Sequence, residues 1–227
     1  MDEQLIPDVA LKRNKAERLP CVVVVDGSLS MGQSGAIADL NEGLKLLAAD
    51  LKDDDDACDA VQIAIIRMGD DDQVETLIPF TDAADFLAPA VRANGSTPLG
   101  KAVDMAMSMI EDQKQRYRQA GVTYKRPWLF VMSDGEPTDE IQEVASRARQ
   151  AQDDKKFILW AIGIGRQVNL GPLSQFCTPD RQPVRLEQSK FKEMFKWMSE
   201  SAKSGSKKAS GQQVSMANPS GWMSATL

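Results

Sequence analysis

Short apolar runs alternate with amphipathic helical stretches along most of this sequence, and that alternation most restricts its fold. The run at residues 21–25 is apolar on both faces and ends at Asp26, which is typical of a buried parallel strand. Further strands are predicted at residues 61–66, 74–80, 127–132, 157–162 and 184–186, with 74–80 as a candidate edge strand. The alternation predicts a doubly wound α/β fold whose mostly parallel central sheet is flanked by helices.

Apolar side chains at helical spacing mark the connecting segments. The first helix carries them on one face: Ile37, Leu40, Leu44, Leu47 and Leu51. A second helix is predicted to begin at Pro98, since proline suits the first helical position. Others are predicted at about 139–150 and at 190–202. The acidic runs 53–56 and 70–72 lack the spacing of an EF-hand and are predicted to be solvated loops. Residues 163–165 are predicted to be a turn at a strand end.

Composition and charge narrow the class of protein. The chain has 227 residues, of which 42% are apolar and 26% charged, enough for one α/β domain with a full core. A net charge of -6 argues against a nucleic-acid binder, which needs clustered Lys and Arg. No apolar run approaches the roughly 20 residues needed to span a bilayer. The N-terminus lacks a secretory apolar core, so we expect a cytoplasmic protein with no membrane partner.

The cysteines and the absence of histidine exclude several kinds of chemistry. Cys21, Cys58 and Cys177 are widely spaced and form no CxxC pair, so neither a zinc site nor a disulfide framework is expected. The sequence contains no histidine. A Ser-His-Asp or Cys-His mechanism is therefore impossible within this chain, and the usual histidine-rich metal sites are excluded too.

Two terminal segments differ from the rest in composition. Residues 1–18 are predicted to be an N-terminal arm, and 19–202 the folded domain. Residues 203–227 form a tail rich in Ser, Lys and Gly that contains no acidic residue. Such a tail is either disordered or regulatory. A single aromatic residue, Trp222, could anchor it to this domain or to a partner.

Polar side chains follow the predicted strands at one edge of the sheet, where parallel sheets form their sites. The first strand leads into Asp26, Ser28 and Ser30, the loop before the second long helix supplies Thr97, and the fourth strand leads into Asp134. We expect these five residues to converge. All are oxygen donors, which predicts a hard divalent cation, Mg2+ first and Mn2+ or Ca2+ as alternatives.

The order of these residues resembles the metal-ion-dependent adhesion site of von Willebrand factor A domains. Asp26-x-Ser28-x-Ser30, then Thr97, then Asp134 match all five positions of that motif, and the resemblance covers residues 19–202. It implies a Rossmann-like fold and a non-enzymatic, metal-dependent protein-interaction module. The serines and the threonine then bind the metal, the aspartates often act through water, and a partner's Asp or Glu completes the shell. A phosphorylated side chain of a partner is our alternative for that last position. Leu29 departs from the small residue common at its position.

A narrower resemblance is carried by residues 18–20, 26–31, 96–100, 126–128, 133–139 and 221–222. Together they are similar to bacterial tellurite-resistance-associated von Willebrand A proteins. This resemblance implies a stress-response or defence protein associated with a Ser/Thr kinase and a metal-dependent Ser/Thr phosphatase.

Two other interpretations remain open. A strand that ends in Asp26, followed by a Ser-Asp-Gly turn after a later strand, also resembles haloacid-dehalogenase-type phosphatases. Those enzymes need a second Asp two residues on as acid and base, and here that position is Ser28, which cannot do that work. The third interpretation is a scaffold that works with an empty site.

Overall fold

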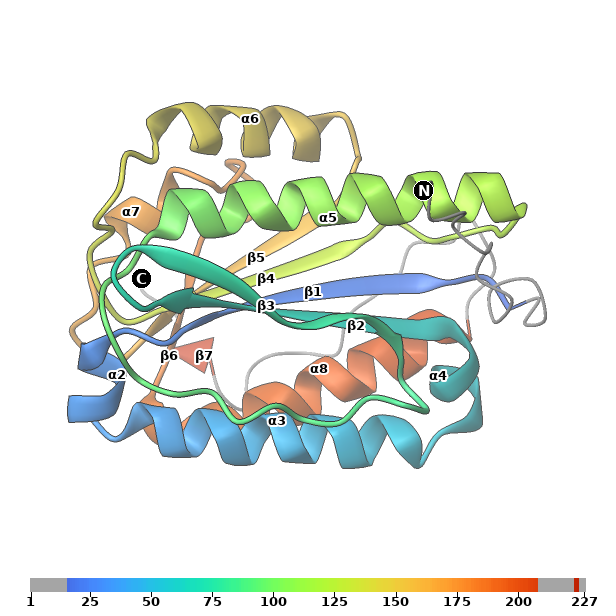
Figure 1. Cartoon of the computed structure of the whole chain (residues 1–227), viewed down its shortest axis with the longest axis horizontal. Helices are drawn as coiled ribbons and strands as arrows, with labels where there is room; N and C mark the ends of the chain where they lie inside the picture. The colour runs from blue at the N-terminus through green and yellow to red at the C-terminus, as the bar shows by residue number, and fades with distance from the viewer. Residues whose placement is uncertain (1–15, 208–222, 225–227) are drawn as a thin grey trace, which may run out of the picture.

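The computed structural model describes residues 16–207 and 223–224, and these residues build a seven-stranded sheet in the order β3-β2-β1-β4-β5-β6-β7. Figure 1 shows the sheet between two layers of helices. All neighbouring strands are parallel except the antiparallel edge pairs β2–β3 and β6–β7. The predicted α/β fold is confirmed. The strands are β1 Leu19–Asp26, β2 Val61–Gly69, β3 Gln73–Asp82, β4 Trp128–Ser133, β5 Ile158–Ile164, β6 Val184–Leu186 and β7 Met223–Ser224.

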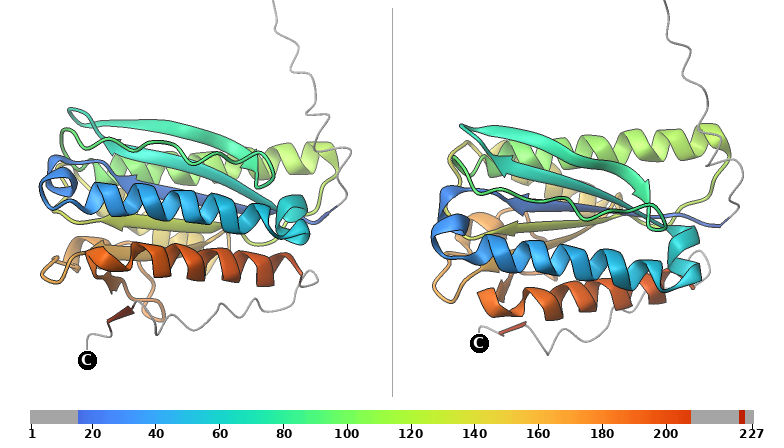
Figure 2. Two further views of the ribbon diagram at one scale, coloured as in Figure 1. Left: turned by 90° about the horizontal axis from the view of Figure 1, so that it is seen from below. Right: turned by 60° about the horizontal axis from the view of Figure 1, so that its bottom comes forward.

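The helices cover both faces of the sheet. Figures 1 and 2 show α5 and α6 on one face, and α3 and α8 packed side by side on the other. A short 3-10 turn, η1 Gln188–Lys190, leads into α8. The α-helices are α2 Leu29–Gln33, α3 Ala36–Lys52, α4 Asp55–Ala60, α5 Leu99–Ala120, α6 Gln142–Asp153, α7 Gly171–Ser174 and α8 Phe191–Ser206.

The two helical layers explain the continuous apolar run of β1. Val23 and Val25 pack into the cluster beneath α3 and α8, whereas Val22 and Val24 pack into the cluster beneath α5 and α6. All four side chains are fully buried. Each contributes about 1.5–3 kcal/mol relative to an exposed side chain. The strand that ends at the predicted site is thus fixed from both sides.

The structure corrects the prediction for residues 53–56. Asp54 caps a short helix, α4, and its carboxylate accepts a hydrogen bond from the Ala57 amide at 2.9 Å. Asp55 and Asp56 occupy the first turn of that helix, where negative charge is favourable next to the helix dipole. An acidic run that looked like a solvated loop is therefore a helix start.

Smaller corrections concern where helices begin and end. Pro98 is the residue before α5, not its first residue, and α6 begins three residues later than predicted, at Gln142. Two one-turn helices, α2 and α7, were not predicted. Helix α8 continues to Ser206, so the first residues assigned to the tail belong to it. Lys125 stabilises this last turn by donating hydrogen bonds from Nζ to the carbonyl oxygens of Gly205 and Ser206.

Both terminal segments touch the sheet. Arg18, the last residue of the predicted arm, is fully buried and donates hydrogen bonds to the Asp59 carbonyl and the Asp82 carboxylate. At the other end, Met223 pairs with Leu186, so β7 extends the sheet. Trp222 lies outside the described residues. Within residues 16–207 and 223–224, no helix is both long and apolar enough to cross a membrane.

Candidate metal centre

The five residues predicted to form a site lie together at the carboxyl edge of the sheet. Asp26 ends β1, Ser28 is the N-cap residue of α2, Ser30 lies in the first turn of α2, and Asp134 follows β4. Thr97 comes from the loop before α5. A Cβ placed on Gly135 would be 3.6 Å from Thr97 Oγ1 and 4.0 Å from Ser30 Oγ. The hydroxyl groups of Thr97 and Ser30 therefore both lie beside Gly135, next to Asp134.

Asp26 is the buried centre of this arrangement. Its Oδ1 accepts a hydrogen bond from the Ser28 amide at 2.8 Å, and its Oδ2 accepts one from Ser133 Oγ at 2.7 Å. The Asp134 amide lies 3.4 Å from the same Oδ2. Burial raises the pKa of Asp26, while the hydrogen bonds from Ser28 and Ser133 act in the opposite direction. Asp26 therefore joins β1 to the turn after β4.

The hydroxyl groups form a chain above Asp26. Ser28 Oγ and Ser30 Oγ are 2.9 Å apart, and Ser30 Oγ donates to Asp134 Oδ1 at 2.7 Å. Ser28 and Thr97 are buried, whereas Ser30 is exposed and Asp134 is half-buried. Partial burial raises the pKa of Asp134, and the hydrogen bond from Ser30 opposes that rise. The cluster thus opens to solvent on the side of Ser30.

These donors fit a small hard cation. Two neighbouring ligands of an octahedral Mg2+ at about 2.1 Å would be roughly 3 Å apart, which matches the 2.9 Å between Ser28 Oγ and Ser30 Oγ. Burial raises the pKa of Asp26 and Asp134, and a positive ion next to them would lower it. Among the described residues, no group of three or more His, Cys, Asp or Glu could hold a metal, so a cation here depends on the hydroxyl groups.

Asp72, in the β2–β3 turn, connects the segments that surround the cluster. Its Oδ1 accepts hydrogen bonds from Ser96 Oγ at 2.6 Å and Thr138 Oγ1 at 2.8 Å, and its amide donates to Ser96 Oγ at 2.9 Å. The Thr97 carbonyl in turn accepts a hydrogen bond from the Thr138 amide at 2.9 Å. Asp72 was predicted to lie in a solvated loop; instead it is half-buried and positions the Thr97 loop.

Asp139 provides a second connection, which the sequence reasoning also missed. Helix α5 has no side-chain cap of its own, because Pro98 occupies the N-cap position. The Asp139 carboxylate accepts hydrogen bonds from the Gly100 amide at 3.0 Å and the Lys101 amide at 2.8 Å. It therefore caps α5 from the segment that follows Asp134. The acid-rich stretch after residue 133 was the only signal of this role.

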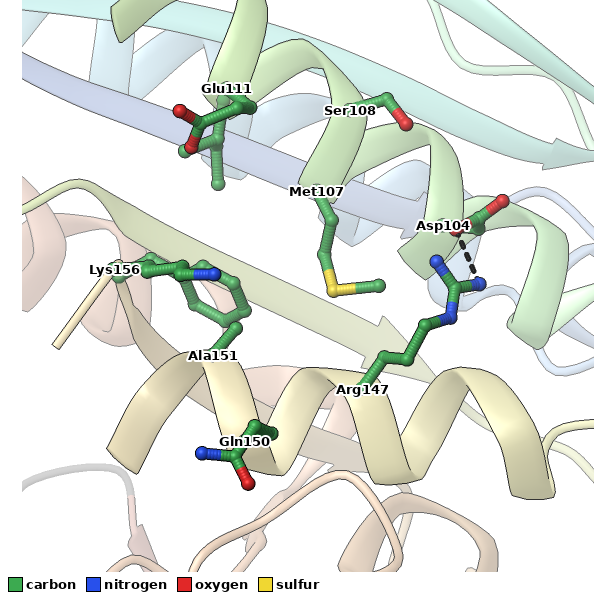
Figure 3. Close-up of a pocket in the computed structure, with 10 residues that line it drawn as sticks. Asp104, Met107, Ser108, Glu111, Arg147, Gln150, Ala151 and Lys156 are labelled. Carbon is green, nitrogen blue, oxygen red and sulfur yellow. Dashed lines mark hydrogen bonds and ion pairs between the residues drawn. The ribbon is translucent and has the colours of Figure 1, made fainter. Parts of the chain in front are cut away.

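A groove between α5 and α6 is a second candidate site. Figure 3 shows it between the two helices, with Met107 among its lining residues and Asp104 next to Arg147. Its volume is about 400 Å³. Asp104 and Arg147 neutralise each other across 2.8 Å, and Glu111 is engaged by Lys114 at 2.7 Å. The acidic side chains of the groove are therefore paired with basic ones.

The fold and the hydroxyl-rich edge define an α/β domain of the kind that carries its site at the carboxyl ends of the strands. The chain matches the von Willebrand factor type A domain over residues 21–199 and belongs to that family. Domains of this family generally mediate protein–protein interactions. A comparison with curated protein sequences finds no match.

Solved structures share this fold at low sequence identity. The von Willebrand domain of the type V pilus tip protein Mfa5 from Porphyromonas gingivalis is 12% identical, with a TM-score of 0.66 over 87% of this chain and 99% of that one. The pilus adhesin SpaC from Lactobacillus rhamnosus GG is 12% identical, with a TM-score of 0.63 over 83% of this chain and 30% of SpaC.

Proximal thread matrix protein 1 from the mussel byssus, in a structure with a zinc-occupied MIDAS motif, is 15% identical, with a TM-score of 0.55 over 82% of this chain. This chain spans about half of the mussel protein, 48% of its length. At such identities the likeness shows the fold alone.

Proposed function

We propose that this chain is a non-enzymatic, cation-dependent protein-interaction module. Mg2+, with Mn2+ or Ca2+ as alternatives, is held by the hydroxyls of Ser28, Ser30 and Thr97, with Asp26 and Asp134 beside them. An Asp or Glu of a partner protein completes the coordination. The observation that carries the proposal is the continuous oxygen cluster in which Ser28 Oγ, Ser30 Oγ and Asp134 Oδ1 follow one another at 2.9 and 2.7 Å.

The charge of the site supports an external acidic ligand. Both carboxylate oxygens of Asp26 already accept hydrogen bonds from the protein. Asp26 therefore stabilises the site from its buried side. The hydroxyl donors are neutral. A divalent cation held by them keeps positive charge on its solvent side, and a carboxylate from another molecule neutralises it.

The same contacts argue against the phosphatase alternative. A nucleophilic Asp must reach a substrate phosphorus with a free oxygen. Asp26 is fully buried, and its two oxygens are engaged by Ser28 and Ser133. Measuring turnover of a generic phosphate ester with Mg2+ tests this point. Activity that is abolished in Asp26→Asn would favour the enzyme and contradict our proposal.

The zinc-occupied MIDAS motif of the mussel byssus protein supports a divalent cation in a domain of this fold. As a further part of the proposal, we assign the chain to a bacterial cytoplasmic stress-response system related to tellurite resistance, with the narrower sequence resemblance as support. Its expected partners there are a Ser/Thr kinase and a metal-dependent Ser/Thr phosphatase. Capture of partners from the native host with Mg2+ and with EDTA tests this context, since cation-dependent partners should be released by EDTA.

Calorimetric titration with Mg2+ and Mn2+ is the direct test of the site. Ser30→Ala removes a proposed ligand at an exposed position and should weaken binding of both ions. Ser34→Ala is a matched control, because Ser34 lies four residues on and its hydroxyl donates to the Met31 carbonyl and accepts from the Ala36 amide. Equal heats for wild type and both variants would rule out the site.

A further inference from the structure

Leu29 is an exposed apolar side chain inside the proposed metal motif. It lies between Ser28 and Ser30 in sequence and is 53% exposed at the start of α2, whereas Met31 of the same helix is fully buried. Its amide donates to the Gly95 carbonyl at 3.1 Å, so its backbone lies against the loop that leads to Thr97. Leu29 therefore brings apolar surface next to two of the proposed ligands, Ser28 and Ser30.

The turn between β2 and β3 lies on the other side of Gly95. A Cβ on Gly95, whose φ is 77°, would be 2.5 Å from the Asp70 amide nitrogen and 2.6 Å from that of Asp71. Only glycine allows this approach and this backbone conformation. Gly95 therefore lies close to the backbones of both Leu29 and Asp71, two residues before Thr97.

The three acidic residues of this turn have different roles. Asp70, Asp71 and Asp72 all adopt left-handed conformations, with φ of 36°, 51° and 65°. The Asp70 carboxylate is engaged by Arg67 and Asn94, and that of Asp72 by two hydroxyl groups. Within the part of the chain that the structure describes, Asp71 has no recorded hydrogen bond or ion pair, and it is exposed. Its carboxylate is available to a cationic group of another molecule.

We propose that the partner segment carries an apolar side chain within two residues of its metal-binding Asp or Glu, and a Lys or Arg on the side that faces Asp71. The apolar side chain packs on Leu29, and the basic one pairs with Asp71. This inference rests on the proposed function and deepens it, because it states what surrounds the acidic residue. It commits to a peptide segment of a partner protein, recognised by three chemical features in one short stretch.

Selection from a random peptide library with a fixed central Asp tests this inference. The full chain is immobilised in Mg2+, and bound peptides are released with EDTA. We expect the released peptides to be enriched in an apolar residue within two positions of the Asp and in Lys or Arg on one side of it. Selection on Leu29→Ala should lose the apolar enrichment, and selection on Asp71→Asn should lose the basic one.

Matched controls lie at the opposite edge of the sheet. Leu87 is 71% exposed and Asp85 is exposed, both in the segment after β3, so Leu87→Ala and Asp85→Asn should select the same peptides as wild type. One selected peptide is then titrated against each variant at saturating Mg2+. Leu29→Ala should weaken binding about fivefold, as expected for loss of part of a buried leucine contact. Asp71→Asn should weaken it about twofold at low salt and less at high salt.

The outcomes distinguish failure of this inference from failure of the proposed function. Peptides released by EDTA that show neither preference, or preferences that survive Leu29→Ala and Asp71→Asn, would overturn this inference and leave the proposed function standing. If no peptide is released by EDTA, the proposed function and this inference fail together. Calorimetry with Mg2+ alone then shows whether the cation site itself is absent or whether only the acidic ligand was wrong.

Discussion

Replacing Asp139 with alanine removes the contact that joins the start of α5 to the segment after Asp134. The Asp139 carboxylate accepts hydrogen bonds from the amides of Gly100 and Lys101, two of the amide groups that a helix leaves unpaired at its N-terminus. Thr97 lies two residues before this helix of 22 residues. Loss of the cap should therefore loosen both the first turn of α5 and the position of the Thr97 hydroxyl.

The expected magnitude follows from the two amides and the half-buried carboxylate. Removing a helix cap costs about 0.5–2 kcal/mol, and the charge of Asp139 next to the helix dipole adds roughly 0.3–1 kcal/mol. We expect a loss of about 1–2 kcal/mol in the free energy of unfolding. Loss of a residue that orients a metal ligand typically weakens metal binding about 10–100-fold, so Mg2+ affinity should fall by at least the lower value.

Urea unfolding and calorimetric Mg2+ titration measure the two effects separately. Asp54→Ala is the matched control, because Asp54 also caps a helix but does so at α4, before the first residue of β2. It should lower stability and leave Mg2+ affinity as in wild type. Asp139→Asn should restore only part of both quantities, because its single amide oxygen can replace one of the two carboxylate oxygens that accept from Gly100 and Lys101. If Asp139→Ala lost stability but bound Mg2+ like wild type, our account of how Thr97 is positioned would be wrong.

Three further outcomes test other contacts. Gly43→Ala should lower the free energy of unfolding by about 1–3 kcal/mol, because a Cβ there would lie 2.3 Å from Phe195 Cδ2; an unchanged urea midpoint would contradict this packing. Thr97→Val should weaken Mg2+ binding about tenfold or more, and wild-type heats in a titration would remove Thr97 from the ligand set. Hydrogen bonds from Ser96 and Thr138 lower the pKa of Asp72 from its ordinary 3.8, so ionised Asp72 stabilises the fold above an unfolded-state pKa of about 3.9, and this stabilisation is lost as the pH falls through the lower folded-state value. The stability difference between wild type and Asp72→Asn in urea unfolding should therefore shrink as the pH falls below about 4, and a difference independent of pH would count against this role.

The sheet was predictable because its strands carry their signal locally. The run 21–25 is apolar on both faces, and only a strand covered by helices on both sides buries all of it. Residues 74–80 were predicted to be a candidate edge strand, and the half-exposed residues of β3 agree with that position. The convergence of Asp26 and Asp134 followed from topology alone, since the carboxyl ends of parallel strands meet at one edge.

Contacts between distant segments were not predictable in the same way. Asp139 caps a helix whose first residues lie 38 and 39 positions earlier, and no pattern within a short window records that distance. Arg18 was assigned to an arm because its neighbours are charged, yet it is buried against Asp59 and Asp82. The acidic turn around Asp72 looked solvated because three adjacent aspartates repel each other in water. Its hydroxyl partners become visible only when the loops are assembled.

The hydroxyl and carboxylate groups of the cluster have different roles in binding a cation. A serine hydroxyl has one proton and two lone pairs, so it can donate to a carboxylate and still offer an oxygen lone pair to a cation. Ser30 Oγ donates to Asp134 Oδ1 and therefore accepts from Ser28 Oγ, which leaves one lone pair for a cation. A carboxylate that accepts this proton makes the hydroxyl oxygen more electron-rich and so a better ligand. Replacing Ser30 would therefore remove a ligand, whereas replacing Asp134 with Asn would leave every hydroxyl in place and weaken cation binding through the charge that supports them.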